Sequence, residues 1–133
     1  MSDALDTSIE CVLFDLDGTL IDTVADFVVV VNQLLQEHNK PHIESRLIQQ
    51  TVSNGARALV KLAFQIEENH TDFPGLNQRL LDLYLQQLES TQATLYPGLD
   101  ELLAKLENAD IPWGIVTNKP EKYSVVLLDK LGL

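Results

Sequence analysis

Hydrophobic residues form two short continuous runs, and elsewhere along the chain they recur every three or four positions. The first run covers residues 10–16 and ends at an Asp-Gly pair, and the second covers residues 112–117. Short apolar runs bounded by turn residues are typical of strands that are buried on both faces, as in a parallel sheet. The pattern therefore predicts two buried parallel strands that are joined through helices.

The segments between and after these runs have the periodicity of helices. A first helix follows Asp22 and Thr23, either of which can cap it, and its apolar positions continue to His38. Residues 67–75 are polar and contain a proline, so they are predicted to form a loop. Further helices are predicted through residues 47–48, 56–66, 76–88, 99–106 and 121–131. This order of elements is typical of an α/β protein.

Two strands alone make an incomplete sheet. Both edges would be open, and a third strand is expected after the glycine at position 132. We therefore expect the sheet to continue beyond residue 133. For the 133-residue chain by itself, open edges predict aggregation, strand pairing or swapping, including a homodimer.

Composition and charge narrow the range of partners. The 133 residues are 45% hydrophobic and 22% charged, which predicts one globular domain or slightly less. Twenty acidic residues oppose nine basic ones, for a net charge of −11, and without a basic stripe the chain is not expected to bind nucleic acid. The longest apolar stretch, residues 27–31, is too short to span a membrane.

Cysteine content and the N-terminal sequence predict the compartment. The only cysteine, Cys11, lies inside an apolar run and is predicted to be a buried, reduced thiol. Residues 1–10 are polar and acidic and do not have the pattern of a signal peptide. We therefore expect a soluble cytoplasmic protein.

Two aspartates at the end of the first run are the strongest candidates for chemistry. Ligand sites in open parallel sheets lie at the carboxyl ends of strands, and period-two alternation places Asp15 and Asp17 on the same side of an extended chain. Such a pair suits one carboxylate as nucleophile and the other as proton donor and acceptor, with Mg²⁺ to screen the charge of a phosphoryl group. The simpler alternative is an Asp-Gly turn without chemistry.

Residues 14–23, Phe-Asp-Leu-Asp-Gly-Thr-Leu-Ile-Asp-Thr, resemble the first motif of the haloacid dehalogenase-like phosphohydrolases. This resemblance implies a Rossmann-like α/β core with an inserted all-helical cap. It also implies that Asp15 forms an aspartyl-phosphate and that Asp17 protonates the leaving group and then activates water. Mg²⁺ would be held by the Asp15 carboxylate and by the backbone carbonyl of Asp17.

The Ile-Val-Thr-Asn run at residues 115–118 resembles the second motif of the same family. It implies that the Thr117 hydroxyl binds the phosphoryl group, assisted by the backbone N–H of Asn118. The third motif supplies a lysine and the fourth supplies acids for Mg²⁺, both well after the second motif, whereas only 16 residues follow Thr117. Lys119 lies next to the second motif and is not assigned the missing role. We therefore expect the 133-residue chain to be inactive by itself.

The helical block at residues 22–92 resembles the cap that this family places after its first motif, which leaves residues 1–21 and 93–133 as the core. A mobile cap excludes water and reads the leaving group of the substrate.

Within the cap, Asn54, Gly55 and Arg57 are the candidates for substrate specificity. A glycine break before a helix offers free N–H groups to an anion, and Arg57 could bind a carboxylate or a sugar hydroxyl. The alternative is that Arg57 is an exposed helix residue without a ligand.

Residues 52–58 and 113–120 resemble the phosphoglycolate phosphatase-like branch, and in particular the bacterial N-acetylmuramic acid 6-phosphate phosphatases. This implies a Mg²⁺-dependent phosphomonoesterase that acts on a small phosphorylated metabolite. Two alternatives stay open, namely a phosphosugar mutase of the same family and a truncated, non-catalytic relic or interaction module.

Overall fold

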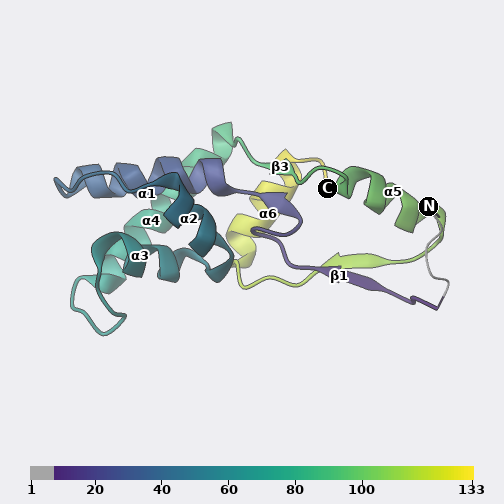
Figure 1. Ribbon diagram of the computed structural model, residues 1–133, viewed down its shortest axis with the longest axis horizontal. Coiled ribbons are helices and arrows are strands. Elements are labelled where there is room, and N and C mark those ends of the chain that lie inside the picture. Colours follow the sequence, from purple (N-terminus) through teal and green to yellow (C-terminus); the bar gives the residue numbers. More distant parts are fainter. Residues whose placement is uncertain (1–7) are drawn as a thin grey trace.

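The computed structural model describes residues 8–133, so the part of the predicted core at residues 1–7 lies outside the described residues. In Figure 1 the helices α1–α4 lie together on one side, β1 and α5 lie on the other, and α6 lies between them. The helices and strands are, in order, β1 (Val12–Phe14), β2 (Ile21–Asp22), α1 (Val24–Glu37), α2 (Ser45–Thr51), η1 (Val52–Asn54), α3 (Ala56–Phe64), α4 (Phe73–Gln87), η2 (Leu88–Ser90), β3 (Thr94–Leu95), α5 (Leu99–Asn108), β4 (Trp113–Ile115) and α6 (Glu121–Lys130).

The prediction of two parallel strands joined through helices is confirmed. β1 pairs with β4 in parallel, with Phe14 opposite Ile115. The Val116 N–H donates to the Phe14 carbonyl at 2.8 Å, one residue beyond the end of β4. The loops that follow β1 and β4 therefore leave the sheet at the same edge.

A second, antiparallel pair of strands was not predicted. β2 pairs with β3, with Ile21 opposite Leu95, and the Tyr96 N–H extends the contact to the Leu20 carbonyl at 3.2 Å. The chain thus enters the helices α1–α4 and leaves them through neighbouring strands. Two-residue strands have no detectable periodicity, which explains why the sequence pattern did not reveal them.

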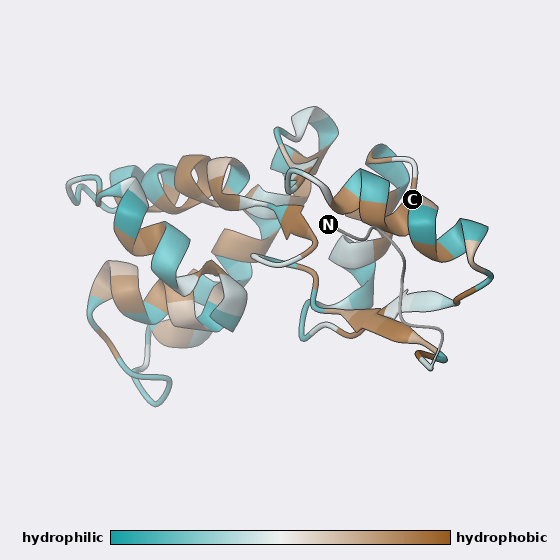
Figure 2. Ribbon diagram, turned by 45° about the vertical axis from the view of Figure 1, so that its right-hand side comes forward, coloured by the Kyte–Doolittle hydropathy of each residue, from teal (hydrophilic) through white to brown (hydrophobic). Residues whose placement is uncertain are grey.

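Hydrophobic side chains join the helices α1–α4 into one layer. Phe27 of α1 stacks on Tyr84 of α4 with ring centroids 4.4 Å apart, and both residues are buried. Figure 2 shows hydrophobic segments alternating with hydrophilic ones along these helices, as expected for helices that bury one face.

Among residues 8–133, no helix is both long and apolar enough to cross a membrane.

One buried residue of α1 is an acid. Asp26 is fully buried and accepts hydrogen bonds from the Gln92 N–H at 2.8 Å, from the Gln87 amide at 3.2 Å and from the Thr91 hydroxyl. The three donors lie at the end of α4 and in the segment that leads to β3. Asp26 therefore ties the start of the helical layer to its exit.

Two predictions about burial are wrong. Leu13 is 63% exposed, so β1 is not buried on both faces: among residues 8–133, the face on which Leu13 lies is left largely open to solvent. Cys11 is exposed and not buried, because the strand begins one residue after it.

One prediction about the start of a helix is also wrong. α4 begins at Phe73, inside the predicted loop, and Phe73 itself is buried. Pro74 is compatible with this start because the first turn of a helix leaves N–H groups unpaired in any case. α1 ends at Glu37, in agreement with the helix end predicted at residues 38–41, but His38 is exposed and does not extend the apolar face of that helix.

Candidate active site

The loop after β1 gives Asp15 and Asp17 different surroundings. Asp15 is exposed, and its carboxylate accepts the Leu16 N–H at 2.8 Å, whereas Asp17 is 5% exposed. The backbone turns directly after Asp15, with the Leu20 N–H bonded to the Asp15 carbonyl at 3.2 Å. The extended backbone of β1 ends at Phe14, so period-two alternation along a strand does not by itself determine how the two carboxylates lie relative to one another.

The segment around η1 lies against both loops at the sheet edge. Gly18 has a φ of +82°, and a Cβ added to it would lie 2.7 Å from the Ser53 hydroxyl oxygen. Gly55 has a φ of +91°, and a Cβ added there would lie 3.4 Å from the Asn118 side chain. The two glycines allow the helical layer to approach the loops after β1 and β4 closely.

We expect Gly18→Ala to lower the free energy of unfolding by about 1–2 kcal/mol, because alanine is strained at positive φ and Ser53 must move away. Gly75→Ala is the matched control. Gly75 lies in the first turn of α4 with no atom within 4 Å of an added Cβ, so this change should be neutral or stabilising. Urea unfolding of both variants measures the difference, and an equal effect of the two would contradict the close approach at Gly18.

The loop after β4 brings a lysine to Asp17. The Lys119 ammonium lies 2.8 Å from Asp17 Oδ1, and the side chains are only 5% and 7% exposed. The Thr23 hydroxyl donates to the same oxygen at 2.9 Å. The Lys119 N–H donates to the Thr117 hydroxyl oxygen at 3.0 Å, which places Thr117 beside this contact.

Sequence reasoning missed Lys119 as a site residue. The family resemblance implies a lysine later in the chain, so it gives no role to Lys119 and no acidic partner for it. The available signal was its position two residues after Thr117, at the sheet edge where Asp17 also lies.

Burial dominates the electrostatics around Lys119. It lowers the pKa of the Lys119 ammonium, and the neighbouring Asp17 carboxylate opposes this shift. Tyr84, whose ring centroid lies 4.3 Å from the ammonium, has its pKa raised, mainly by burial and also by Asp17. Within residues 8–133, the buried Tyr84 hydroxyl has no hydrogen-bond partner.

Two adjoining cavities lie beside these residues. The smaller, about 40 Å³, is lined by Asp17 and Lys119, among others. The larger, about 290 Å³, brings the predicted specificity residues together with the second motif, being lined by Asn54, Gly55, Ala56, Arg57, Asn77, Leu81, Asn118 and Pro120. Asp15 lines neither cavity and stays at the exposed sheet edge.

Arg57 has partners of its own inside the helical layer. Its guanidinium group lies 3.2 Å from the Glu68 carboxylate and 5.3 Å from the centre of the Phe73 ring. The side chain is exposed, so this ion pair is weak and solvent-screened. Arg57 therefore faces the larger cavity, but it is not a free cation.

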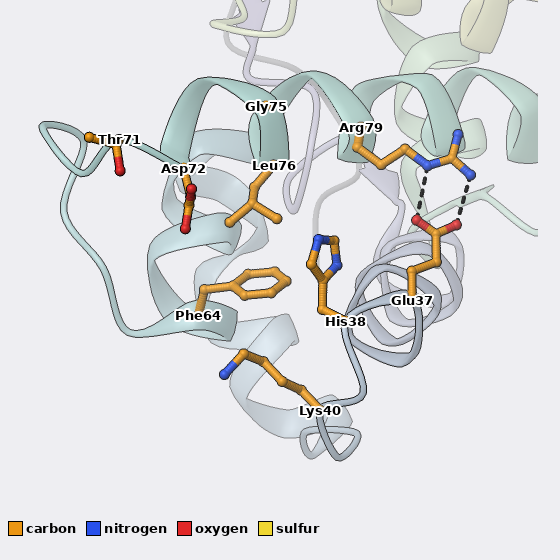
Figure 3. Close-up of a pocket in the computed structure, with 9 residues that line it drawn as sticks. All are labelled: Glu37, His38, Lys40, Phe64, Thr71, Asp72, Gly75, Leu76 and Arg79. Atoms are coloured by element: carbon orange, nitrogen blue, oxygen red, sulfur yellow. Dashed lines mark hydrogen bonds and ion pairs between the residues drawn. The ribbon is translucent and has the colours of Figure 1, made fainter.

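A cavity of about 700 Å³, larger than either of the two adjoining cavities, lies elsewhere. Figure 3 shows it between the ends of α1 and α3 and the start of α4, beside the bidentate pair of Arg79 and Glu37. Helix α1 has 14 residues and is therefore about 21 Å long. This cavity lies near its C-terminal end, whereas the loop with Asp17 precedes its N-terminal end, so it is separate from the candidate site.

The site contains oxygen ligands of the type that Mg²⁺ prefers, but it contains few of them. The exposed Asp15 carboxylate is a suitable ligand, and the backbone carbonyl of Asp17 is the second ligand that the family resemblance implies. The side-chain oxygen Oδ1 of Asp17 is already bonded to Lys119 and Thr23. Among the described residues, no group of three or more acidic, histidine or cysteine residues lies close enough together to hold a metal. The described residues therefore fit part of a Mg²⁺ site, centred on Asp15.

Fold and site together define an α/β protein with a helical cap over the carboxyl edge of a parallel strand pair. Residues 12–133 match the family described as haloacid dehalogenase-like hydrolase, and the chain belongs to this family.

Two curated relatives are phosphatases by name. The chain is 37% identical over 125 residues to an N-acetylmuramic acid 6-phosphate phosphatase from Pseudomonas putida, which covers 94% of this chain and 56% of the relative. It is 40% identical over 124 residues to a phosphoglycolate phosphatase from Xanthomonas campestris, covering 91% of this chain and 54% of the relative. The chain therefore spans about half the length of these relatives.

Solved structures show the same fold. A crystal structure of a predicted phosphoglycolate phosphatase from Haemophilus somnus superposes with a TM-score of 0.80 at 28% identity, covering 95% of this chain and 59% of that one. A putative haloacid dehalogenase-like hydrolase from Bacteroides fragilis also gives a TM-score of 0.80, at 20% identity, covering 91% and 57% of the two chains.

Proposed function

We propose that this chain forms the part of a Mg²⁺-dependent phosphomonoesterase that carries the nucleophile, and that the enzyme acts on a small phosphorylated metabolite. The observation that carries the proposal is the meeting of both motif loops at one sheet edge, where Asp17 and Lys119 are in contact. The phosphatase names of the curated relatives support the reaction class. They also give two candidate substrates, 2-phosphoglycolate and N-acetylmuramic acid 6-phosphate.

The reaction proceeds in two steps. A carboxylate oxygen of Asp15 attacks phosphorus and forms an aspartyl-phosphate, while the bond to the leaving oxygen breaks and Asp17 gives that oxygen a proton. Asp17 then takes a proton from water, whose oxygen attacks the same phosphorus and releases inorganic phosphate and free Asp15. When bound at Asp15, Mg²⁺ screens the negative charge that converges there.

The remaining motif residues bind the phosphoryl group and the rest of the substrate. Thr117 follows β4 at the edge where Asp15 follows β1, which supports the assignment of its hydroxyl and the Asn118 N–H to the binding of phosphoryl oxygens. We assign residues 22–92 to the cap, since β2 and β3 mark where the chain enters and leaves the helical layer. The cavity of about 290 Å³, with Asn54, Gly55 and Arg57, would hold the leaving group.

The test is release of inorganic phosphate by the longest gene product that contains these residues. We expect turnover of at least one of 2-phosphoglycolate, N-acetylmuramic acid 6-phosphate and p-nitrophenyl phosphate, lost with EDTA and restored by Mg²⁺. Residues 1–133 alone should show little turnover, because the Mg²⁺ site of the described residues is partial.

Two outcomes would contradict this proposal. An isomerised sugar phosphate without net phosphate release would indicate a mutase. No turnover together with no stabilisation by Mg²⁺ in thermal unfolding would indicate a non-catalytic protein.

A further inference from the structure

Lys119 is a buried lysine, and buried lysines are rare unless they are paired. Its ammonium group meets three separate parts of the molecule. Asp17 comes from the loop after β1, whereas the rings of Phe27 and Tyr84 come from α1 and α4, with centroids 5.0 and 4.3 Å from the ammonium nitrogen. A cation placed over aromatic faces is attracted to them, and more strongly when water is excluded.

The contact fixes the orientation of the Asp17 carboxylate. Lys119 and Thr23 both donate to Oδ1, at 2.8 and 2.9 Å. Two donors on Oδ1 fix the orientation of the carboxylate plane. Because Oδ1 is occupied by these two hydrogen bonds, Oδ2 is the oxygen that would carry the proton in catalysis. The backbone of Lys119 is held in turn, since its N–H donates to Thr117 and its carbonyl accepts the Ser124 hydroxyl at 3.2 Å.

We propose that Lys119 is a positioning residue that holds Asp17 for proton transfer and is itself held by the Phe27–Tyr84 ring pair of the helical layer. This proposal rests on the proposed function, because it assigns a role within that reaction. It also connects the two halves of the molecule: the packing of α1 on α4 sets where Lys119 lies, and Lys119 sets where the Asp17 carboxylate lies.

Direct binding of the phosphoryl group by Lys119 fits the structure less well. The cavity at its side chain has a volume of about 40 Å³, against about 290 Å³ for the adjoining cavity, which Lys119 does not line. The ammonium is already surrounded by Asp17 and the two rings. Lys119 therefore acts through Asp17, and this distinction can be measured.

The experiment compares two leaving groups in Lys119→Met, using the longest gene product that contains these residues. An alkyl phosphomonoester needs a proton on its leaving oxygen, whereas p-nitrophenolate leaves without one. We expect kcat/KM to fall at least about tenfold further for 2-phosphoglycolate or N-acetylmuramic acid 6-phosphate than for p-nitrophenyl phosphate. Lys122→Met, an exposed lysine of α6, is the matched control and should leave both values unchanged.

A double-mutant cycle on stability checks that Lys119 works through Asp17. Lys119→Met leaves a buried carboxylate unpaired, but in an Asp17→Asn background no such charge remains. We expect Lys119→Met to lower the folding equilibrium constant at least about tenfold more in the wild-type background than in the Asp17→Asn background. This comparison remains informative if the single variant is poorly stable, because the double variant removes both charges.

The outcomes are distinct. A larger loss for the alkyl ester together with a coupled stability effect supports the proposal. Equal losses for both substrates, no loss for either, or additive stability effects would overturn it. A wild-type protein that releases phosphate from none of the substrates would instead refute the proposed function, and the assignment of a catalytic role to Lys119 would fall with it.

Discussion

Asp15→Asn should abolish phosphate release while leaving the fold intact. An asparagine side chain is uncharged and its amide is a poor nucleophile, so the aspartyl-phosphate cannot form, and we expect kcat to fall by roughly a thousandfold or more. Stability should change little. Asp15 is exposed, and its hydrogen bond from the Leu16 N–H can be kept by the asparagine oxygen. The measurement is steady-state phosphate release with saturating Mg²⁺, together with the urea unfolding midpoint.

Asp22→Asn is the matched control for this variant. Asp22 lies in the same motif and likewise accepts a backbone N–H, that of Val24, at 3.1 Å. Its asparagine variant should keep that bond and retain phosphate release within a few-fold of wild type. Turnover by Asp15→Asn at a rate near that of the control would rule out Asp15 as the nucleophile.

The sequence predicted the helices and the parallel strands well because their signals are local. Apolar residues at helical spacing placed α5 and α6 close to their observed limits, and the motif string placed Asp15 and Asp17 after a strand. The features that the sequence could not predict depend on contacts between segments that are distant in the chain. The pairing of β2 with β3 and the contact of Lys119 with Asp17 each join residues that lie far apart in the chain.

Burial was harder to predict than secondary structure for the same reason. Cys11 and Leu13 lie in an apolar run, yet both are exposed, because burial depends on what packs against the strand. Asp26 shows the opposite case. An acid in the first turn of a helix is favourable at the surface, so its position alone gives no reason to expect it to be fully buried.

Asp26→Ala should lower the stability of the fold more than Gly18→Ala or Asp15→Asn. Alanine leaves the Gln92 N–H and the Gln87 amide without their buried acceptor, and it opens a small void between α1 and the segment that leads to β3. We expect the free energy of unfolding to fall by about 3 kcal/mol. Asp26→Asn retains one oxygen acceptor and most of the volume, and it should cost about half as much, since neutral hydrogen bonds are weaker than charge-assisted ones.

The control for Asp26→Ala is Asp82→Ala, an exposed acid of α4 whose carboxylate accepts a hydrogen bond from the Gln78 amide at 2.9 Å. That change should stay within about 0.5 kcal/mol of wild type. Urea unfolding gives the free energies, and hydrogen exchange of the Gln92 amide gives a local measure that should speed up in Asp26→Ala alone. Equal stabilities of the two variants would show that Asp26 does not tie the entry of the helical layer to its exit. If Asp26→Ala is less stable than Asp82→Ala as expected, then the buried Asp26 carboxylate helps to hold the helices α1–α4 in place, in addition to the Phe27–Tyr84 contact. These helices carry the two rings that contact Lys119.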